Sequence, residues 1–345
     1  MKKILSILLS VIMIITLLAS CTGEADKKVV TTAETSAEKA PSLSKDPVRV
    51  FTLKGPTGMG MAPLMHLSDN GNSKLNYEFT VANAADEFTG NIIQGNFEIA
   101  CVPTNLAAVL DTKTNGAIQV AAVNTLGVLY LLENGNTVNS INDLKGKTIY
   151  SAGQGAVPEY ALKYILESFN INCEVVYESE HDVVVQDIMT NTASIALLPE
   201  PKVTAALKNE NAPKDLRIAL DLNELWDAAC AANNDQSELY MGCIIVNKSW
   251  AEGHKAELEA FLSEYRACVD MVNNDPDTAS NIIAEYGIIP KAPLAKAAIP
   301  NAKIVVITGE EMTNGLLGFY EILYNYNPQA VGGKVPTESI FYKFD

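Results

Sequence analysis

The chain has 345 residues, of which 48% are hydrophobic and 19% charged, and its formal net charge is −16. This composition is typical of a globular protein and excludes a wholly disordered chain. The sequence contains no basic stripe, so nucleic-acid binding is disfavoured, and the acidity favours solubility rather than a specific partner.

The first segment in chain order is a predicted secretory signal. Two lysines precede an apolar run over residues 4–18, which is shorter than the roughly 20 residues that span a bilayer. The run ends in Leu-Ala-Ser-Cys at 18–21, which resembles the bacterial lipobox. The resemblance implies that residues 1–20 are removed and that Cys21 becomes a lipidated N-terminus. The alternative is an ordinary secreted protein in which this cysteine occurs by chance.

The next segment, 21–46, is polar and contains no aromatic residue. It cannot bury enough apolar surface to offset the entropy cost of ordering. We therefore predict a flexible tether that holds the folded part away from the membrane. The folded part, from residue 47 onwards, is long enough for two lobes with separate cores.

Short apolar strands then alternate with amphipathic helices. We expect strands at 48–53, 77–81, 99–102 and 118–124, and helices at 59–67, 87–94 and 105–110. Asp86 is the expected N-cap of the second helix. This alternation predicts an α/β fold with mainly parallel sheets and helices on both faces.

A second set of elements begins at residue 127. We expect strands at 127–132, 148–151, 173–177 and 195–198, helices at 158–168, 182–189 and 203–208, and further apolar runs at 217–220 and 241–246. The last third is mostly helical, and a helix over 258–272 has one clear apolar face. Helices at 277–286 and 310–324 follow, the second with a predicted capping box from Thr308 to Glu311.

The cysteines limit the covalent structure. There are six, and lipidation of the first leaves an odd number, so at least one thiol stays free. Cys101, Cys243 and Cys268 lie in apolar runs, which is typical of small core residues. A disulfide joining Cys173 to Cys230 is one pairing that the sequence allows.

Four sequence segments resemble those of a known family. They are Gly-Pro-Thr-Gly-Met at 55–59, Val-Pro-Thr-Asn at 102–105, Asp-Leu-Lys-Gly-Lys-Thr at 143–148 and Leu-Pro-Glu-Pro at 198–201. Together they resemble the periplasmic-binding-protein type II fold. More narrowly, they resemble the nitrate, taurine or alkanesulfonate and thiamine-pyrimidine-precursor binding proteins of ABC importers.

The resemblance implies two lobes joined by two hinge crossings. Lobe one would take residues 47–125 and 244–345, and lobe two would take the inserted residues 126–243. The crossings would lie near 124–127 and 240–243. Gly127 and Gly242 are equally explained as turn or packing glycines. The implied function is capture of a small molecule between the lobes and its delivery, by a monomer, to an ABC permease.

Ligands of open α/β sheets bind beyond the carboxyl ends of the strands. Strand–helix turns with small residues stand there at 55–60, 103–105, 152–156 and 199–201, where free helix N–H groups can bind ligand oxygens. Each turn alone is more simply an ordinary connection, whereas all of them together in this fold favour a cleft. The candidate ligand-binding residues are Thr57, Gly58, Met59, Thr104, Asn105, Asn124, Thr125, Gln154, Gly155, Ala156, Glu200 and Tyr240.

The side chains near these turns limit the ligand. Arg49, Arg217 and Arg266 all lie away from the turns, so an anion has no arginine partner, although backbone N–H groups alone could bind one. Glu200 stands between two prolines and could meet a cationic ligand. The expected ligand is a pyrimidine, an amine-bearing heterocycle or a sulfonate.

Other residues at the turns have simpler explanations. Glu87 and Glu159 lie in first helical turns, where carboxylates complement the helix dipole, and Asp86 is expected as a cap. Met59 and Tyr240 are residue types found more often in a core than at a ligand.

The sequence shows no catalytic motif. It contains no G-x-S-x-G, H-E-x-x-H or P-loop, and His66, His181 and His254 share no metal-ligand spacing. We therefore predict a binding protein without catalytic residues, metal or cofactor. The first alternative is a small-molecule-processing enzyme that resembles the thiamine-pyrimidine synthase, whose cysteine cluster and sacrificial histidine are not visible here. The second is a surface interaction lipoprotein, which would show repeats or an exposed aromatic patch.

Overall fold

The computed structural model describes residues 43–344, which form two sheets with helices packed on them. The predicted signal peptide, the predicted lipidation at Cys21 and most of the predicted tether lie outside the described residues. Within the described part, no helix has both the length and the apolar character needed to cross a bilayer.

The last residues of the predicted tether, 43–46, contact the folded part. Leu43 packs against an apolar core cluster. The Ser44 backbone N–H donates a hydrogen bond of 2.6 Å to Oε1 of Glu257, a buried residue of α10 (Lys255–Asn274). The prediction of a flexible segment as far as residue 46 is therefore wrong at its end, because these contacts hold the chain against α10.

The first sheet has six strands in the order β11-β4-β10-β3-β1-β2. They are β1 (Val48–Leu53), β2 (Tyr77–Ala82), β3 (Ile99–Pro103), β4 (Ile118–Leu126), β10 (Tyr240–Asn247) and β11 (Ile304–Ile307). β1 pairs in parallel with β2 and β3. β10 pairs antiparallel with β3 and β4, and β11 pairs antiparallel with β4.

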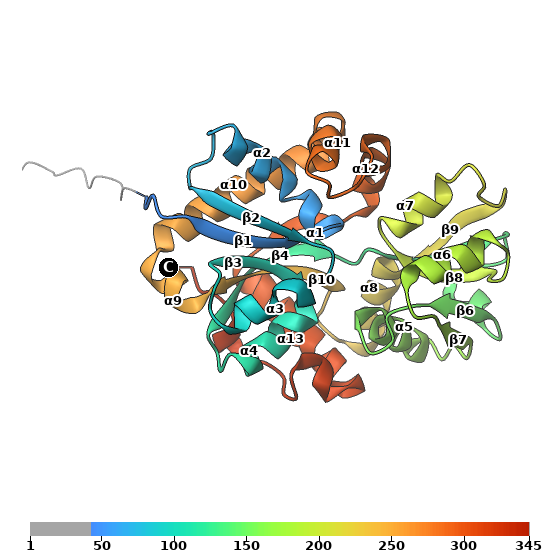
Figure 1. Cartoon of the computed structure of the whole chain (residues 1–345). Helices are drawn as coiled ribbons and strands as arrows, with labels where there is room; N and C mark the ends of the chain where they lie inside the picture. The colour runs from blue at the N-terminus through green and yellow to red at the C-terminus, as the bar shows by residue number, and fades with distance from the viewer. Residues whose placement is uncertain (1–42, 345) are drawn as a thin grey trace, which may run out of the picture. The chain divides into compact units, whose positions relative to one another are not determined.

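Helices cover both faces of this sheet (Figure 1). One face carries α2 (Ala62–Asp69), α10, α11 (Pro276–Glu285) and α12 (Ala292–Ala298), and the other carries α3 (Asp86–Ile93), α4 (Thr104–Lys113) and α13 (Gly309–Tyr326). Along β3, Ile99 and Cys101 belong to the core under α2 and α10, and Ala100 and Val102 belong to the core under α4 and α13. Because both faces are buried, the strand is a continuous apolar run. The short elements beside this sheet are α1 (Pro56–Met59), α9 (Lys248–Gly253), η2 (Ile299–Asn301), η3 (Pro328–Val331) and η4 (Glu338–Ile340).

The second sheet has five strands in the order β7-β6-β8-β5-β9. They are β5 (Leu129–Asn134), β6 (Thr148–Ser151), β7 (Glu174–Tyr177), β8 (Ile195–Pro199) and β9 (Leu216–Asp221), with η1 (Ile141–Leu144) before β6. β6 is parallel to β7 and β8, and β5 is antiparallel to β8 and β9. One face carries α5 (Val157–Ser168) and α8 (Leu222–Asn233), and the other carries α6 (His181–Met189) and α7 (Lys202–Leu207).

The α/β architecture is confirmed, and both sheets are mixed. In the first sheet β10 and β11 run against β1, β2, β3 and β4, and in the second sheet β5 runs against β6, β7, β8 and β9. Parallel neighbours need a crossover connection, usually a helix, as between β1, β2 and β3. β5 instead follows β4 directly into the other sheet, and β10 returns from that sheet. Both strands consequently run antiparallel to their neighbours.

Three local predictions about helices are wrong. In place of the helix expected at 59–67, the chain forms a short α1 that ends at Met59 and a second helix, α2, that begins at Ala62. Asp86 is the first residue of α3 and not its cap. Thr308 is the N-cap of α13, but its side chain makes no capping hydrogen bond, so the predicted capping box is not formed.

The cysteines at 101, 173, 230, 243 and 268 are free thiols, so the disulfide that the sequence allowed between Cys173 and Cys230 is not formed. The Sγ atom of Cys230 instead accepts a hydrogen bond of 3.6 Å from Tyr164 OH. Cys101, Cys243 and Cys268 are core residues with at most 3% of their surface exposed, which confirms the prediction for them.

Candidate functional site

The chain passes between the two sheets twice, through residues 127–128 and through residues 234–239. Gly127 donates its backbone N–H to Asn223 Oδ1 at 3.1 Å, and a Cβ on this glycine would lie 2.5 Å from the same oxygen. A Cβ on Gly242 would lie 2.6 Å from Oδ1 of Asn124. Both glycines therefore permit close packing beside the crossings. The hinge and the lobe boundaries remain predictions.

The β1–α1 turn and the β8–α7 turn, one from each sheet, lie beside one another. A Cβ on Gly55 would be 3.8 Å from Cδ of Pro201. Asn301, at the end of η2, donates its side-chain amide to Glu200 Oε1 at 3.3 Å. The hydroxyl of Tyr130 on β5 donates to the Asn301 carbonyl at 2.9 Å. Two of the predicted turns are thus brought together from opposite sheets.

The β3–α4 turn and helix α5 are connected through the segment that leads into η3. Asn105 Nδ2 donates to the Ala330 carbonyl at 3.4 Å, and Asn327 Nδ2 donates to Tyr160 OH at 2.8 Å. Tyr326 stacks on Tyr160 with ring centroids 6.4 Å apart. The remaining two turns therefore meet only indirectly, through a segment that the sequence pattern did not mark.

A buried polar group lies where β3, β4 and β10 run side by side. Thr104 Oγ1 donates to the Tyr240 carbonyl at 2.7 Å, and Thr125 Oγ1 donates to Asn124 Oδ1 at 3.2 Å. Each of these predicted site residues is at most 2% exposed. Nδ2 of Asn124 has no hydrogen-bond partner among the described residues. The Thr104–Tyr240 hydrogen bond therefore joins α4 to β10, and the Asn124 amide lies near the Cys101 thiol and the Tyr265 hydroxyl in the core.

The remaining predicted site residues lie either in the core or partly at the surface. A Cβ on Gly58 would lie 2.2 Å from the Leu53 carbonyl, and Met59 is fully buried in the core that includes α10. Met59 is therefore a core residue, as its residue type suggested. The loop residues that keep some exposure are Thr57, Gln154, Gly155 and Ala156.

Carboxylates lie at two of the predicted turns. Glu159 Oε2 accepts the Gly155 backbone N–H at 2.5 Å, and its Oε1 accepts Lys163 Nζ at 2.6 Å. Burial raises the pKa of Glu159, but the hydrogen bonds from Lys163 and Gly155 outweigh burial and hold this pKa below its ordinary value.

Glu200 has a less compensated environment and is only 3% exposed. Its Oε1 accepts Thr204 Oγ1 at 2.8 Å, and its Oε2 accepts the Thr204 backbone N–H at 3.2 Å. Burial raises the pKa of Glu200 above its ordinary value in spite of these hydrogen bonds.

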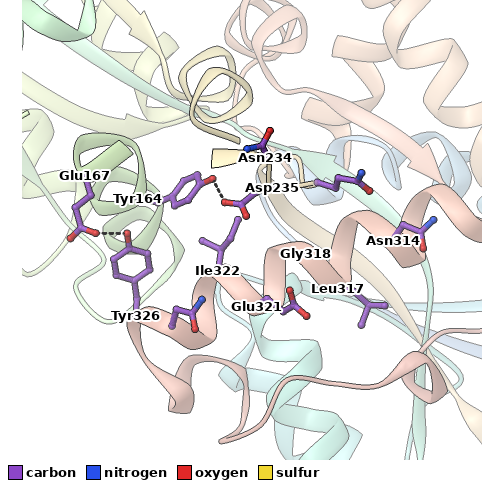
Figure 2. Close-up of a pocket in the computed structure, with 12 residues that line it drawn as sticks. Tyr164, Glu167, Asn234, Asp235, Asn314, Leu317, Gly318, Glu321, Ile322 and Tyr326 are labelled. Carbon is purple, nitrogen blue, oxygen red and sulfur yellow. Dashed lines mark hydrogen bonds between the residues drawn. The ribbon is translucent and has the colours of Figure 1, made fainter. Parts of the chain in front are cut away.

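A groove of about 540 Å³ lies between α13, α5 and residues 234–236 (Figure 2). The charged side chains that line it are all carboxylates: Glu167, Asp235 and Glu321. Figure 2 shows two of these carboxylates accepting tyrosine hydroxyls, Asp235 from Tyr164 at 2.6 Å and Glu167 from Tyr326 at 2.7 Å. The groove is therefore acidic, and two of its three carboxylates are already hydrogen-bonded.

None of the predicted ligand-binding residues lines this groove. Its helical residues recur at intervals of three and four, as in Asn314, Gly318, Glu321 and Asn325 of α13. That spacing places them on one face of the helix. The sequence contained this polar face, but the prediction of a helix at 310–324 did not assign its faces.

Residues 115–279 match the family model described as NMT1/THI5 like. The matched segment includes every strand of the second sheet, both passages between the sheets and β10. The match confirms the resemblance to the family that the turn sequences indicated. No curated protein matches the sequence significantly.

Solved structures share the fold. A structure described as an ABC transporter from Parabacteroides distasonis has a TM-score of 0.72 and 23% identity, covering 88% of this chain and 100% of its own. The periplasmic aliphatic sulphonate binding protein SsuA from Escherichia coli has a TM-score of 0.65 and 14% identity, with coverages of 86% and 96%. The periplasmic nitrate-binding protein NrtA from Synechocystis has a TM-score of 0.54 and 10% identity, with coverages of 87% and 88%. These TM-scores establish a common fold of the two-lobe periplasmic-binding-protein type.

The histidines do not assemble into a metal centre. They lie on α2, at the start of α6 and at the end of α9. Across residues 43–344, no group of three or more His, Cys, Asp or Glu side chains is arranged to hold a metal ion.

Proposed function

We propose that this protein is the solute-binding component of an ABC importer, held at the outer face of the membrane by a lipid on Cys21. In this proposal, lobe one (47–125 and 244–345) and lobe two (126–243) close on a small molecule. The permease then takes the solute from the closed form. Cys21 would serve only as the anchor.

The observation that carries the proposal is the meeting of strand–helix turns from different sheets. Gly55 of the first sheet faces Pro201 of the second, and Asn301 is hydrogen-bonded to Glu200 across the same boundary. In open α/β sheets, ligands bind at this edge, beyond the carboxyl ends of the strands. A solute held there would contact both sheets at once, and it would therefore favour the closed arrangement.

Polar side chains of the first-sheet turns support the same location. Thr57 and Asn105 are the half-buried polar side chains of the first-sheet turns, and we expect them to contact the solute directly.

Thermal denaturation of the mature protein tests this function. The panel contains pyrimidines, amine-bearing heterocycles, alkanesulfonates, nitrate and amino acids, and one class should raise the Tm while the solute is recovered unchanged. Replacing Thr57 and Asn105 together by alanine should weaken binding of that class by about tenfold or more without lowering the Tm of the free protein.

The matched control replaces Thr192 and Asn209 by alanine, because both residues are exposed and lie outside the predicted turns. It should bind as the unmodified protein does. Equal affinities of the two double variants would remove Thr57 and Asn105 from the site. Conversion of a solute to a product would replace the binding function by an enzymatic one.

A further inference from the structure

We propose that the solute carries a cationic nitrogen group, which lies against Glu200, and that the cleft rejects oxyanions. This inference rests on the proposed function and adds the charge of the ligand to it. A sulfonate or nitrate in such a cleft would need the usual partners of an oxyanion, which are helix N-termini and paired or free cationic side chains.

At three helices of the second sheet, α5, α7 and α8, a carboxylate of the chain itself already accepts an N–H of the helix N-terminus or of the turn before it. At α5, Glu159 accepts the Gly155 N–H at 2.5 Å. At α8, Asp221 accepts the Asn223 N–H at 2.8 Å. At α7, Glu200 accepts the Thr204 N–H at 3.2 Å. An oxyanion arriving at any of these positions would meet a negative charge in place of free N–H donors.

The basic side chains nearby are also engaged. Lys163 Nζ lies 2.6 Å from Glu159, and Lys303 Nζ lies 3.5 Å from Asp221. Lys202, in the first turn of α7, pairs with Asp182. Recruiting one of these lysines to an anionic solute would break its present ion pair and leave a carboxylate uncompensated beside the anion.

Glu200 is a buried carboxylate whose charge a bound cation would neutralise. It is 3% exposed, and its hydrogen-bond donors are the neutral groups of Thr204 and Asn301. A buried carboxylate without a cationic partner is costly, and a cation that arrives with the solute would remove that cost. The position is also correct for a ligand contact, because the Glu200–Pro201 turn lies against Gly55 of the first sheet.

The neighbouring tyrosine is consistent with a negative potential at this point. Burial raises the pKa of Tyr130, and the charges of Asp221 and Glu200 raise it further. Since Tyr130 OH donates to the carbonyl of Asn301, whose amide donates to Glu200, the tyrosine lies at the same boundary between the sheets. A cationic group is favoured in such a potential and an anion is not.

The test uses the mature protein and matched triads of solutes, in which one carbon skeleton carries an ammonium, a hydroxyl or a sulfonate group. Calorimetry should show the ammonium member binding at least about tenfold more tightly than the hydroxyl member, with no binding of the sulfonate. Glu200→Gln should reduce this preference to about twofold or less, while binding of the hydroxyl member is unchanged. The matched control is Glu210→Gln, at an exposed position after α7, and it should keep the full preference.

The possible results distinguish a wrong ligand class from a wrong proposed function. Tight binding of a sulfonate, or equal preferences in the Glu200 and Glu210 variants, would overturn the cationic ligand and leave the solute-binding function in place. Failure of every member of every triad to bind would overturn the binding function itself, and the ligand class with it. The comparison within the unmodified protein needs no variant, so it decides the question even where Glu200→Gln destabilises the fold.

Discussion

A single buried carboxylate, Glu133, organises the edge of the second sheet. It is 2% exposed and accepts the Thr137 backbone N–H at 2.8 Å, the Thr137 hydroxyl at 2.6 Å and the Val138 N–H at 3.2 Å. Arg217 completes the site with Nη2 2.7 Å from Oε2. Burial raises the pKa of Glu133, but these hydrogen bonds outweigh burial and hold it below the ordinary value of 4.5.

Glu133→Gln should therefore destabilise the protein by about 2–3 kcal/mol at neutral pH. The substitution removes the carboxylate that pairs with Arg217 and replaces one acceptor oxygen by an N–H donor. Urea denaturation measures this loss. Glu252→Gln, at an exposed position in α9, is the control and should change stability by less than about 0.5 kcal/mol.

The same substitution carries a pH signature. Because the pKa of Glu133 is lower in the folded state than its ordinary value of 4.5, its contribution is fully present above that value. The contribution is lost as the pH falls through the folded pKa. The stability difference between Glu133→Gln and the unmodified protein should consequently shrink in acid. A difference that stays constant from neutral pH to about pH 3 would contradict the account of this residue.

Some residues at the candidate site could be predicted from their type and place, and others could not. Glu200 was singled out because no helix dipole explains a carboxylate between two prolines, and the structure places it at the boundary between the sheets. Its partner Asn301 could not be found, because it follows no predicted strand. Met59 stands at the same kind of turn as Thr57, and only the packing of α10 reveals that it is a core residue.

Helix α8 connects the two halves of the structure through its aromatic residue. Trp226 is fully buried, with ring centroids 4.7 Å from Tyr164 of α5 and 5.7 Å from Phe319 of α13. Phe319 in turn meets Tyr240 of β10 edge to face at 5.9 Å. Relative movement of α8 and α13 must therefore change the surroundings of Trp226.

This packing provides an internal reporter of closure. The chain has two tryptophans, and the second, Trp250, stacks on His254 beside the first sheet. In Trp250→Phe, the fluorescence of Trp226 should change in intensity or wavelength when a solute binds, because the Trp226–Phe319 contact lies between the two sheets. In Trp226→Phe, the remaining Trp250 signal should stay constant. A constant Trp226 signal together with a changing Trp250 signal would show that α8 and α13 move as one body.

Element boundaries followed from the sequence where local physics decides them. β1 has the predicted bounds, because its apolar run is bordered by polar residues. The break between α1 and α2 was missed, and the residues between them, Gly60 and Met61, keep right-handed helical dihedrals that no turn signal marks. α8 was missed although its N-cap Asp221 and the helical spacing of its buried residues Leu222, Trp226, Ala229 and Cys230 were visible.

On the scale of the whole molecule, contacts between the two halves lie on both sides of the crossings. Asn301 and Lys303 contact Glu200 and Asp221 on one side. The segment 326–327 contacts α5 on the other. Antiparallel entry of β5 and β10 follows from this path of the chain, which strand periodicity cannot reveal. The α/β class, in contrast, could be predicted from the alternation of strands and helices, and the two lobes were implied by the resemblance to the binding-protein family.

Besides the aromatic contacts of Tyr160 with Tyr326 and of Trp226 with Phe319, both sets of contacts are single hydrogen bonds or a partly exposed ion pair, each worth about 1 kcal/mol or less. A solute that bridges the turns adds several such interactions at once, so it can shift the population from open to closed. We therefore expect that solute binding makes the protein more compact.

Small-angle X-ray scattering of the mature protein, titrated with the solute that raises its Tm, tests this claim most directly. We predict that the radius of gyration falls and reaches a plateau at one solute per chain. A radius of gyration that stays constant up to saturation, with the solute demonstrably bound, would contradict closure between the lobes.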